Sequence, residues 1–307
     1  MTLTFKARTP EDILAVAPVI LGFEPEQSVV MLTFGGRHSF HARMDLPEPA
    51  DVEDCVSGLL DPALAHAVAT AVFVIYDGSD LVAQRIARAL RRRFEAADIE
   101  VLEVLHAAGG RYYCPLGRRG VPAHGVPYDV SAHPFRARAA FGGLVTEPSR
   151  AALAARLEPS PSPVPLALIE SAVPLAGPEL RDLIEAHLGA ETLPCDEEAA
   201  AMLRAVGSAA LRHHAWFGIS RHEAARHVRL WTDLVTRAPE SHLGSAAAVL
   251  GFVAWMHGDG AFAWCAVDRA LAAEPDNGLA HLVSDMLCSA TPPRDDWDEM
   301  FPAGIPA

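Results

Sequence analysis

The stretch GSAAAVLGFVAWMHGDGAFAWCAVDRALAAEPDN, residues 244–277, decides the helical half of the fold. Small residues recur in it at positions where two antiparallel helices can touch, and Gly258 falls between the two expected helices, 245–257 and 260–273. Pro275 ends the second helix, because proline cannot continue a helix. The stretch therefore predicts a helical hairpin.

The spacing of this hairpin is similar to that of a tetratricopeptide unit, which repeats about every 34 residues. The matching positions are Leu250, Gly251, Ala254, Gly258, Ala263, Val267, Ala270 and Pro275. Such a hairpin is a packing and binding scaffold, and a lone unit must pack on the helices beside it. A second, degenerate repeat at 204–239 remains an open alternative, because Pro239 and Trp231 match only in part.

Working outward, residues 1–157 alternate strand and helix signals in the order βαββαβαβ. This order predicts an α/β domain with a mixed sheet. Thr2–Ala7 is the first expected strand, and Gly35-Gly36 is an expected hairpin turn between strands 28–34 and 38–45. The apolar run Ala71–Tyr76 is typical of a buried strand.

Prolines mark the boundaries of the second half. Residues 158–177 are predicted to form a Pro-rich linker, and helical patterns fill residues 178–290. Residues 291–307 are expected to be a disordered tail. The expected architecture is an α/β N-terminal domain followed by an all-α helical domain that contains the hairpin 244–277.

Charge and cysteine content limit the partners. The formal charge is −14; residues 1–157 carry 16 basic and 18 acidic side chains, and residues 158–307 carry 9 and 21. This excess of carboxylates argues against nucleic acid. Five cysteines without a C-x-x-C pair argue against a disulfide framework and a zinc site. We find no signal peptide or membrane span, so a cytoplasmic location without membrane, metal or cofactor is expected.

The segment Leu21-Gly22-Phe23-Glu24-Pro25-Glu26-Gln27-Ser28-Val29-Val30 resembles the N-terminal signature of a bacterial family known as domain of unknown function number 4192. Pro148-Ser149-Arg150 and the run from Ala254-Trp255 to Pro275-Asp276 also resemble that family. The resemblance covers nearly the whole chain and implies a common fold without a mechanism. It also implies extra cysteines near residues 111–117, where this chain has only Cys114.

The irregular stretch 109–134 is the first candidate site. It offers Arg111, Arg118, Arg119 and His124 to a ligand. Guanidinium groups with aromatic neighbours suit a carboxylate or phosphate, and the stretch follows an expected strand, where α/β sheets place ligands. The alternative is a solvated loop pinned by Tyr112 and Tyr113. A reactive pair of Cys114 with His124 would need both side chains close in space.

Other candidates carry less specific signals. One helix holds Arg85, Arg88, Arg91, Arg92 and Arg93, and at 100° per residue Arg85, Arg88 and Arg92 share a face that could hold an acidic partner or be merely solvated. His213, His214, His222 and His227 lack the i, i+4 spacing of a helical metal site. Asp45 and Asp77 could be paired carboxylates at one sheet edge or simple turn residues. Glu24, Glu26 and Ser28 could be presented by a ligand loop or belong to a structural connection.

These observations leave two function hypotheses. The first is a non-enzymatic interaction or scaffold protein that binds a protein partner through its helical domain. The alternative is a binder or enzyme for a small anionic ligand at the 109–134 loop. No phosphate-loop, dinucleotide or hydrolase motif supports a particular reaction.

Overall fold

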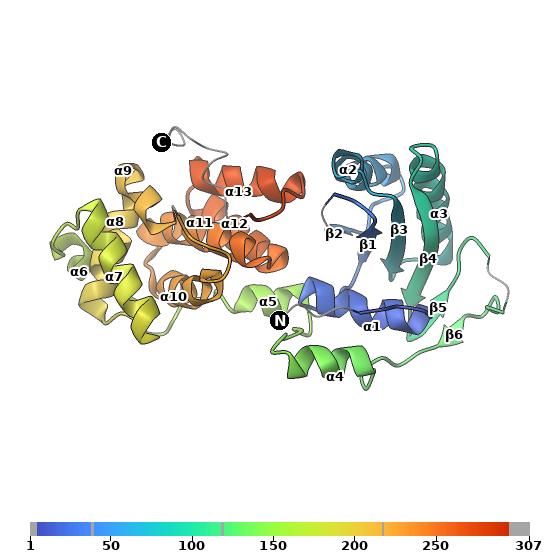
Figure 1. Cartoon of the computed structure of the whole chain (residues 1–307), viewed down its shortest axis with the longest axis horizontal. Helices are drawn as coiled ribbons and strands as arrows, with labels where there is room; N and C mark the ends of the chain where they lie inside the picture. The colour runs from blue at the N-terminus through green and yellow to red at the C-terminus, as the bar shows by residue number, and fades with distance from the viewer. Residues whose placement is uncertain (1–4, 38–39, 118–119, 217, 295–307) are drawn as a thin grey trace. The chain divides into compact units, whose positions relative to one another are not determined.

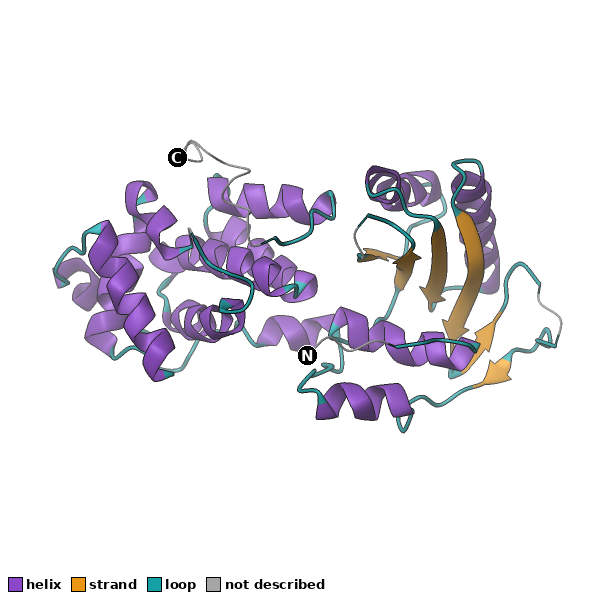
Figure 2. Cartoon of the chain, in the orientation of Figure 1, coloured by secondary structure: helices purple, strands orange, loops and turns teal. Residues whose placement is uncertain are grey.

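The computed structural model describes residues 5–37, 40–117, 120–216 and 218–294. The chain divides into two compact units, Met1–Arg150 and Ala151–Ala307. The first unit contains a mixed sheet with helices, and the second is helical (Figures 1 and 2). The coarse architecture predicted from the sequence is therefore confirmed.

The sheet of the first unit has the order β2-β1-β3-β4-β5-β6. The central strands β1 (Ser28–Phe34) and β3 (Thr70–Tyr76) are antiparallel, and β2 (His41–Asp45) extends the β1 side. β3 runs parallel to β4 (Glu100–Ala108), and the short strands β5 (Arg111–Tyr113) and β6 (Val126–Pro127) follow antiparallel. Both hydrogen-bonding directions occur, as a mixed sheet requires.

Two helical layers cover the sheet. α2 (Val52–Ala65) and α3 (Asp80–Glu95) pack on the face that carries Met31, Phe73 and Ile75. α1 (Pro10–Leu21) packs on the face that carries Leu32 and Val74, and Phe135 of α4 (Pro134–Phe141) lies against this core. The strands can feed two cores because successive side chains point to opposite faces.

Residues close together in the chain set both ends of α1. Thr9 and Asp12 form the capping box at the start of α1, and Gly22 ends that helix with φ of 77°. Both features follow from the sequence because a cap is a contact between close neighbours in the chain.

Three predictions for this unit are wrong. Within the predicted strand Thr2–Ala7, residues 5–7 form no strand and residues 2–4 lie outside the described part; Phe5 packs instead on Phe135 with ring centroids 5.1 Å apart. Gly35-Gly36 is not a two-residue hairpin turn, because Leu32 pairs with His41 and such a turn would pair Leu32 with residue 39; residues 38 and 39 lie outside the described part. The stretch 109–134 is not wholly irregular: Gly109 and Gly110, with φ of 55° and 70°, allow the turn from β4 into β5.

The second unit consists of helices in its described part. They are α5 (Arg150–Ala155), α6 (Leu166–Ser171), α7 (Gly177–Ala190), α8 (Asp196–Gly207), α9 (Ala209–Arg212), the 3₁₀ turn η1 (His213–Ala215), α10 (Ala224–Arg237), α11 (Glu240–His257), α12 (Gly260–Ala273) and α13 (Gly278–Cys288). In the region expected to be a linker, the backbone amides of Ser160 and Val164 donate to the carbonyls of Thr236 and Arg237. Of the expected tail, residues 295–307 lie outside the described residues.

α11 is the centre of this unit, since it is buried from Leu243 to Met256. Its glycines let α12 approach closely: a Cβ on Gly251 would lie 3.1 Å from Cγ2 of Val267. Around the start of α11, buried Arg212 donates to Ser245, and Glu274 accepts from Ser245 and Asn277. No described helix meets the length and apolarity needed to cross a membrane.

Candidate functional site

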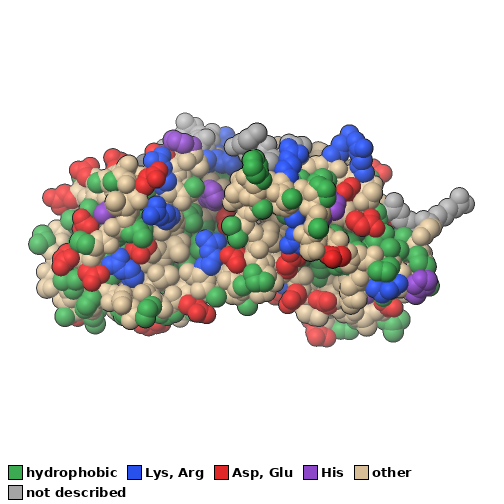
Figure 3. All heavy atoms as spheres, turned by 90° about the horizontal axis from the view of Figure 1, so that it is seen from below, with side chains coloured by type: hydrophobic (Ala, Val, Ile, Leu, Met, Phe, Trp, Pro, Cys, Tyr) green, Lys and Arg blue, Asp and Glu red, His purple; other side chains and the backbone are tan. Residues whose placement is uncertain are grey.

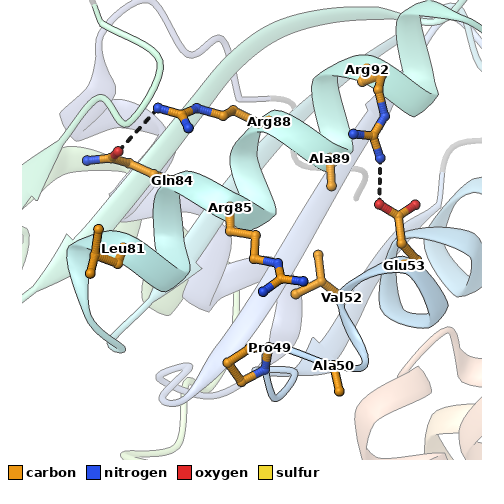
Figure 4. Close-up of a pocket in the computed structure, with 10 residues that line it drawn as sticks. All are labelled: Pro49, Ala50, Val52, Glu53, Leu81, Gln84, Arg85, Arg88, Ala89 and Arg92. Atoms are coloured by element: carbon orange, nitrogen blue, oxygen red, sulfur yellow. Dashed lines mark hydrogen bonds and ion pairs between the residues drawn. The ribbon is translucent and has the colours of Figure 1, made fainter.

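A groove of about 480 Å³ lies in the first unit between α3 and the start of α2 (Figure 4). One wall is the exposed face of α3, and the other is the turn that leads into α2. Its lining residues are Pro49, Ala50, Val52, Glu53, Leu81, Gln84, Arg85, Arg88, Ala89 and Arg92. We call it the α2–α3 groove.

The amphipathic sequence of α3 places the arginines in this groove. Apolar side chains such as Ile86 and Leu90 face the core, and Ser79 caps the helix by accepting from the amide of Val82. Arg85, Arg88 and Arg92 are therefore left on the outer side, as the 100° rotation per residue predicts. All three line the groove, which confirms that they share a face.

The three guanidinium groups differ in their partners. Arg92 forms an ion pair with Glu53 of α2, and hydrogen bonding from Arg92 lowers the pKa of the Glu53 carboxyl. The Nη2 of Arg88 donates to the neutral side-chain oxygen of Gln84 at 3.4 Å. Within the described part of the chain, neither Arg85 nor Arg88 is paired with a carboxylate. Figure 4 shows Arg85 directed toward the start of α2. Two cations therefore remain available to a ligand.

The groove has the chemistry of a binding surface. Its lining contains no histidine or cysteine, and its carboxylate, Glu53, is engaged by Arg92 and by Arg93 at 3.2 Å. Leu81 on one wall and Pro49 and Ala50 on the other add exposed apolar surface. Arginines with a short apolar rim can hold an anionic partner by paired hydrogen bonds and contact area.

In the 109–134 stretch, Arg111 has partners within its own loop. The guanidinium of Arg111 donates from Nε to the carbonyl of His124 at 2.7 Å and from Nη2 to that of Gly125 at 3.0 Å. These bonds close the loop, while the side chain of His124 is exposed. Arg118 and Arg119 lie outside the described residues. Ligand binding by these four residues stays a prediction.

Tyrosines hold this loop to the sheet, as the alternative interpretation of the loop expects. The hydroxyl of buried Tyr112 donates to Glu11 of α1 at 3.0 Å. The ring centroids of Tyr113 and His106 are 5.4 Å apart. Gly125 also packs against Tyr113, because a Cβ on Gly125 would lie 2.7 Å from Cε1 of the tyrosine ring.

Asp45 and Asp77 lie at the same edge of the sheet but do not form a pair. Ser28 of β1 is registered between Asp45 and Tyr76, so about two strand spacings, roughly 10 Å, separate the two positions. Asp45 pairs with Arg43, and Asp77 accepts the backbone amide of Gln27 at 2.8 Å. Each carboxylate has a structural partner of its own.

The segment 21–30 contacts three other parts of the first unit. Besides the Asp77 bond to Gln27, Phe23 forms a bridge with Glu147, and Glu24 pairs with Arg136 of α4. Buried Ser28 begins β1. This favours the structural connection over a presented ligand loop.

Sequence reasoning missed His106 at the same edge. This histidine is 2% exposed, and its Nε2–H donates to the carbonyl of Asp77 at 2.9 Å. Its Nδ1 lies 3.5 Å from the carboxylate of Asp80 at the start of α3. A histidine between Leu105 and Ala107, in the apolar final part of β4, is the sequence signal for this position. Because His106 is buried and contacts both Asp77 and Asp80, it stabilises the turn between β3 and α3.

The histidines of the second unit occupy separate environments. The ring centroids of His213 and His214 are 3.9 Å apart with the ring planes tilted by 38°, and His227 is buried in α10. Across the described ranges, no three His, Cys, Asp or Glu side chains gather in a way that could hold a metal ion.

The fold thus defines a two-unit protein, a mixed-sheet α/β unit and a helical unit, whose first unit carries an arginine groove. The chain belongs to the family described as Domain of unknown function (DUF4192), whose model matches residues 10–191 and 169–294. Comparison with curated proteins gave no match, and comparison with solved structures gave none.

Proposed function

We propose that this protein is a non-enzymatic interaction protein whose first unit binds an acidic protein segment in the α2–α3 groove. The observation that carries the proposal is the set of three arginines on one exposed helix face, of which two have no carboxylate partner in the described chain. Unpaired guanidinium groups in an open groove favour an anionic partner.

The spacing of these arginines favours an extended segment over a compact anion. At about 1.5 Å of rise per residue, Arg85, Arg88 and Arg92 are spread over about 10 Å of α3. Alternate carboxylates of an extended peptide are about 7 Å apart, so two of them can reach two arginines. The apolar rim is well placed for a neighbouring hydrophobic side chain, since Leu81 is 79% exposed.

The test is fluorescence anisotropy with a fluorescein-labelled hexaglutamate peptide, and hexaglutamine as the uncharged comparison. The full chain should bind hexaglutamate and not hexaglutamine. Arg85→Ala with Arg88→Ala should weaken binding about 5- to 30-fold, if each exposed ion pair contributes about 0.5–1 kcal/mol. Raising the salt from about 50 to about 500 mM should also weaken binding of hexaglutamate to the wild-type chain.

The matched control is Arg8→Ala with Arg37→Ala. Both arginines are exposed, belong to the same unit and lie outside the groove, so this pair changes the net charge equally. Equal loss of affinity in the two double variants would show that the peptide responds to overall charge alone, and the proposal would fail.

For the second unit, we propose that α11 and α12 form a tetratricopeptide-like hairpin that serves as a scaffold for a protein partner. The close contact of Gly251 with Val267 supports this, as does the burial of Ala263 and Ala270 between the helices. The five cysteines all lie in the described residues and form no disulfide there, which supports the further proposal of a reducing, cytoplasmic location.

The second candidate function is binding of a small anion at the 109–134 loop. Arg111 closes this loop by donating from Nε and Nη2 to the carbonyls of His124 and Gly125, and within the described residues its Nη1 donors are left for an anion. Inorganic phosphate should then raise the melting temperature of the full chain. Replacement of Arg111, Arg118 and Arg119 by Ala should abolish that increase, and an unchanged increase would contradict this candidate.

A further inference from the structure

Residues 295–301 have the composition that the α2–α3 groove requires. The sequence Asp-Asp-Trp-Asp-Glu-Met-Phe supplies four carboxylates and three large apolar side chains within seven positions. We propose that residues 295–301 of a second copy of the chain bind in the α2–α3 groove and join two copies. This inference rests on the proposed function, because it requires the groove to accept an acidic segment.

Charge complementarity is the first argument. Arg85 and Arg88 have no carboxylate partner in the described residues, and Arg92 shares Glu53 with Arg93. In an extended segment, alternate residues share a face about 7 Å apart, which would group Asp296 with Asp298. That spacing lies within the roughly 10 Å over which the three arginines are spread.

Apolar side chains are the second argument. Leu81 on the α3 wall of the groove and Pro49 and Ala50 on the opposite wall are exposed. The acidic residues of the segment are interleaved with Trp297 and followed by Met300 and Phe301. An aromatic side chain on the exposed Leu81 would remove apolar surface from water, which a purely acidic peptide cannot do. The segment should therefore bind better than hexaglutamate.

The contact is reciprocal. Each copy carries one groove and one segment, so a two-fold pair forms the same contact twice. Once the first contact has formed, the second forms at a high effective concentration. Two copies should therefore associate more tightly than the isolated segment binds to a groove.

The test is sedimentation velocity of the full chain over a range of concentrations at low salt. The wild-type chain should dimerise. Asp295→Asn, Asp296→Asn, Asp298→Asn and Glu299→Gln together should raise the dimer Kd at least about tenfold, as should Arg85→Glu with Arg88→Glu. The control pair Arg8→Glu with Arg37→Glu should leave the dimer in place. Adding Asp296→Arg and Asp298→Arg to the variant with Arg85→Glu and Arg88→Glu should restore dimerisation, because the groove is then acidic and the segment is basic.

A wild-type chain that stays monomeric at about 100 µM, or a dimer that survives both sets of substitutions, overturns the inference. The inference is also overturned if the charge-exchange variant stays monomeric while circular dichroism shows that it is folded. If hexaglutamate still binds the groove in these cases, the proposed function stands and only the identity of the segment is wrong. If hexaglutamate does not bind either, both proposals fail.

Discussion

Gly244 gives the sharpest test of the packing in the helical unit. It lies within α11 and is buried, and a Cβ at this position would lie 2.4 Å from the Cβ of Glu274 and 2.9 Å from its Oε2. Non-bonded carbon atoms are best placed about 3.5–4.0 Å apart. Gly244→Ala therefore requires α11 and the end of α12 to move apart by about 1 Å.

Two effects of Gly244→Ala oppose each other. Alanine in a helix interior is favoured over glycine by about 1 kcal/mol. Overpacking costs about 1–3 kcal/mol, and displacement of Glu274 weakens its bonds from Ser245 and Asn277, each worth about 1 kcal/mol. The sum predicts a loss of about 2–4 kcal/mol, or roughly 4–16 °C in melting temperature.

Urea denaturation followed by tryptophan fluorescence measures this loss selectively. All five tryptophans, at positions 216, 231, 255, 264 and 297, belong to the second unit. Gly189→Ala is the control, because Gly189 is exposed in α7 with nothing within 4 Å of an added Cβ, so this change should stabilise by up to about 1 kcal/mol. A Gly244→Ala midpoint equal to or above that of the wild type would refute the close contact.

Two further predictions concern the same unit. Gly251→Leu should destabilise it by about 1–3 kcal/mol, because even a Cβ would lie 3.1 Å from Val267, and an unchanged melting midpoint would contradict the hairpin packing. Burial lowers the pKa of His227 to about 4, with Glu223 opposing and Arg226 adding to the shift. The unfolded state then binds more protons below pH about 6.5, so stability should be complete above that pH and fall by up to about 3 kcal/mol toward pH 4. His227→Gln should flatten this dependence in urea titrations read by tryptophan fluorescence; an equally steep loss would assign it to other groups.

What the sequence predicts well depends on contacts between near neighbours. The start of α1 follows from Thr9, Pro10 and Asp12, and the end of that helix from Gly22. The helix expected at 260–273 is α12, and the strand expected at 71–76 lies in β3, because the pattern of apolar residues is a local signal.

What the sequence predicts poorly depends on distant partners. The ion pair between Arg92 and Glu53 joins residues 39 positions apart, and the bond from Gln27 to Asp77 spans 50. Periodicity indicated that α3 has a basic face, but only the folded chain shows that the start of α2 turns this face into a groove. In the same way, Asp45 and Asp77 could be placed at strand ends, but not on either side of β1.

The chain carries a formal charge of −14, and this overall charge does not indicate a cationic site. Figure 3 shows acidic and basic side chains interspersed on the face that it draws, so on that face the excess charge is spread out. At physiological salt, charges farther apart than about 8 Å are largely screened from one another. A bound segment therefore responds mainly to the few charges that line the groove. Because Glu53 is shared between Arg92 and Arg93, Arg85 and Arg88 decide the sign of that local field. An acidic protein can thus bind an acidic partner, provided that the partner contacts these two residues.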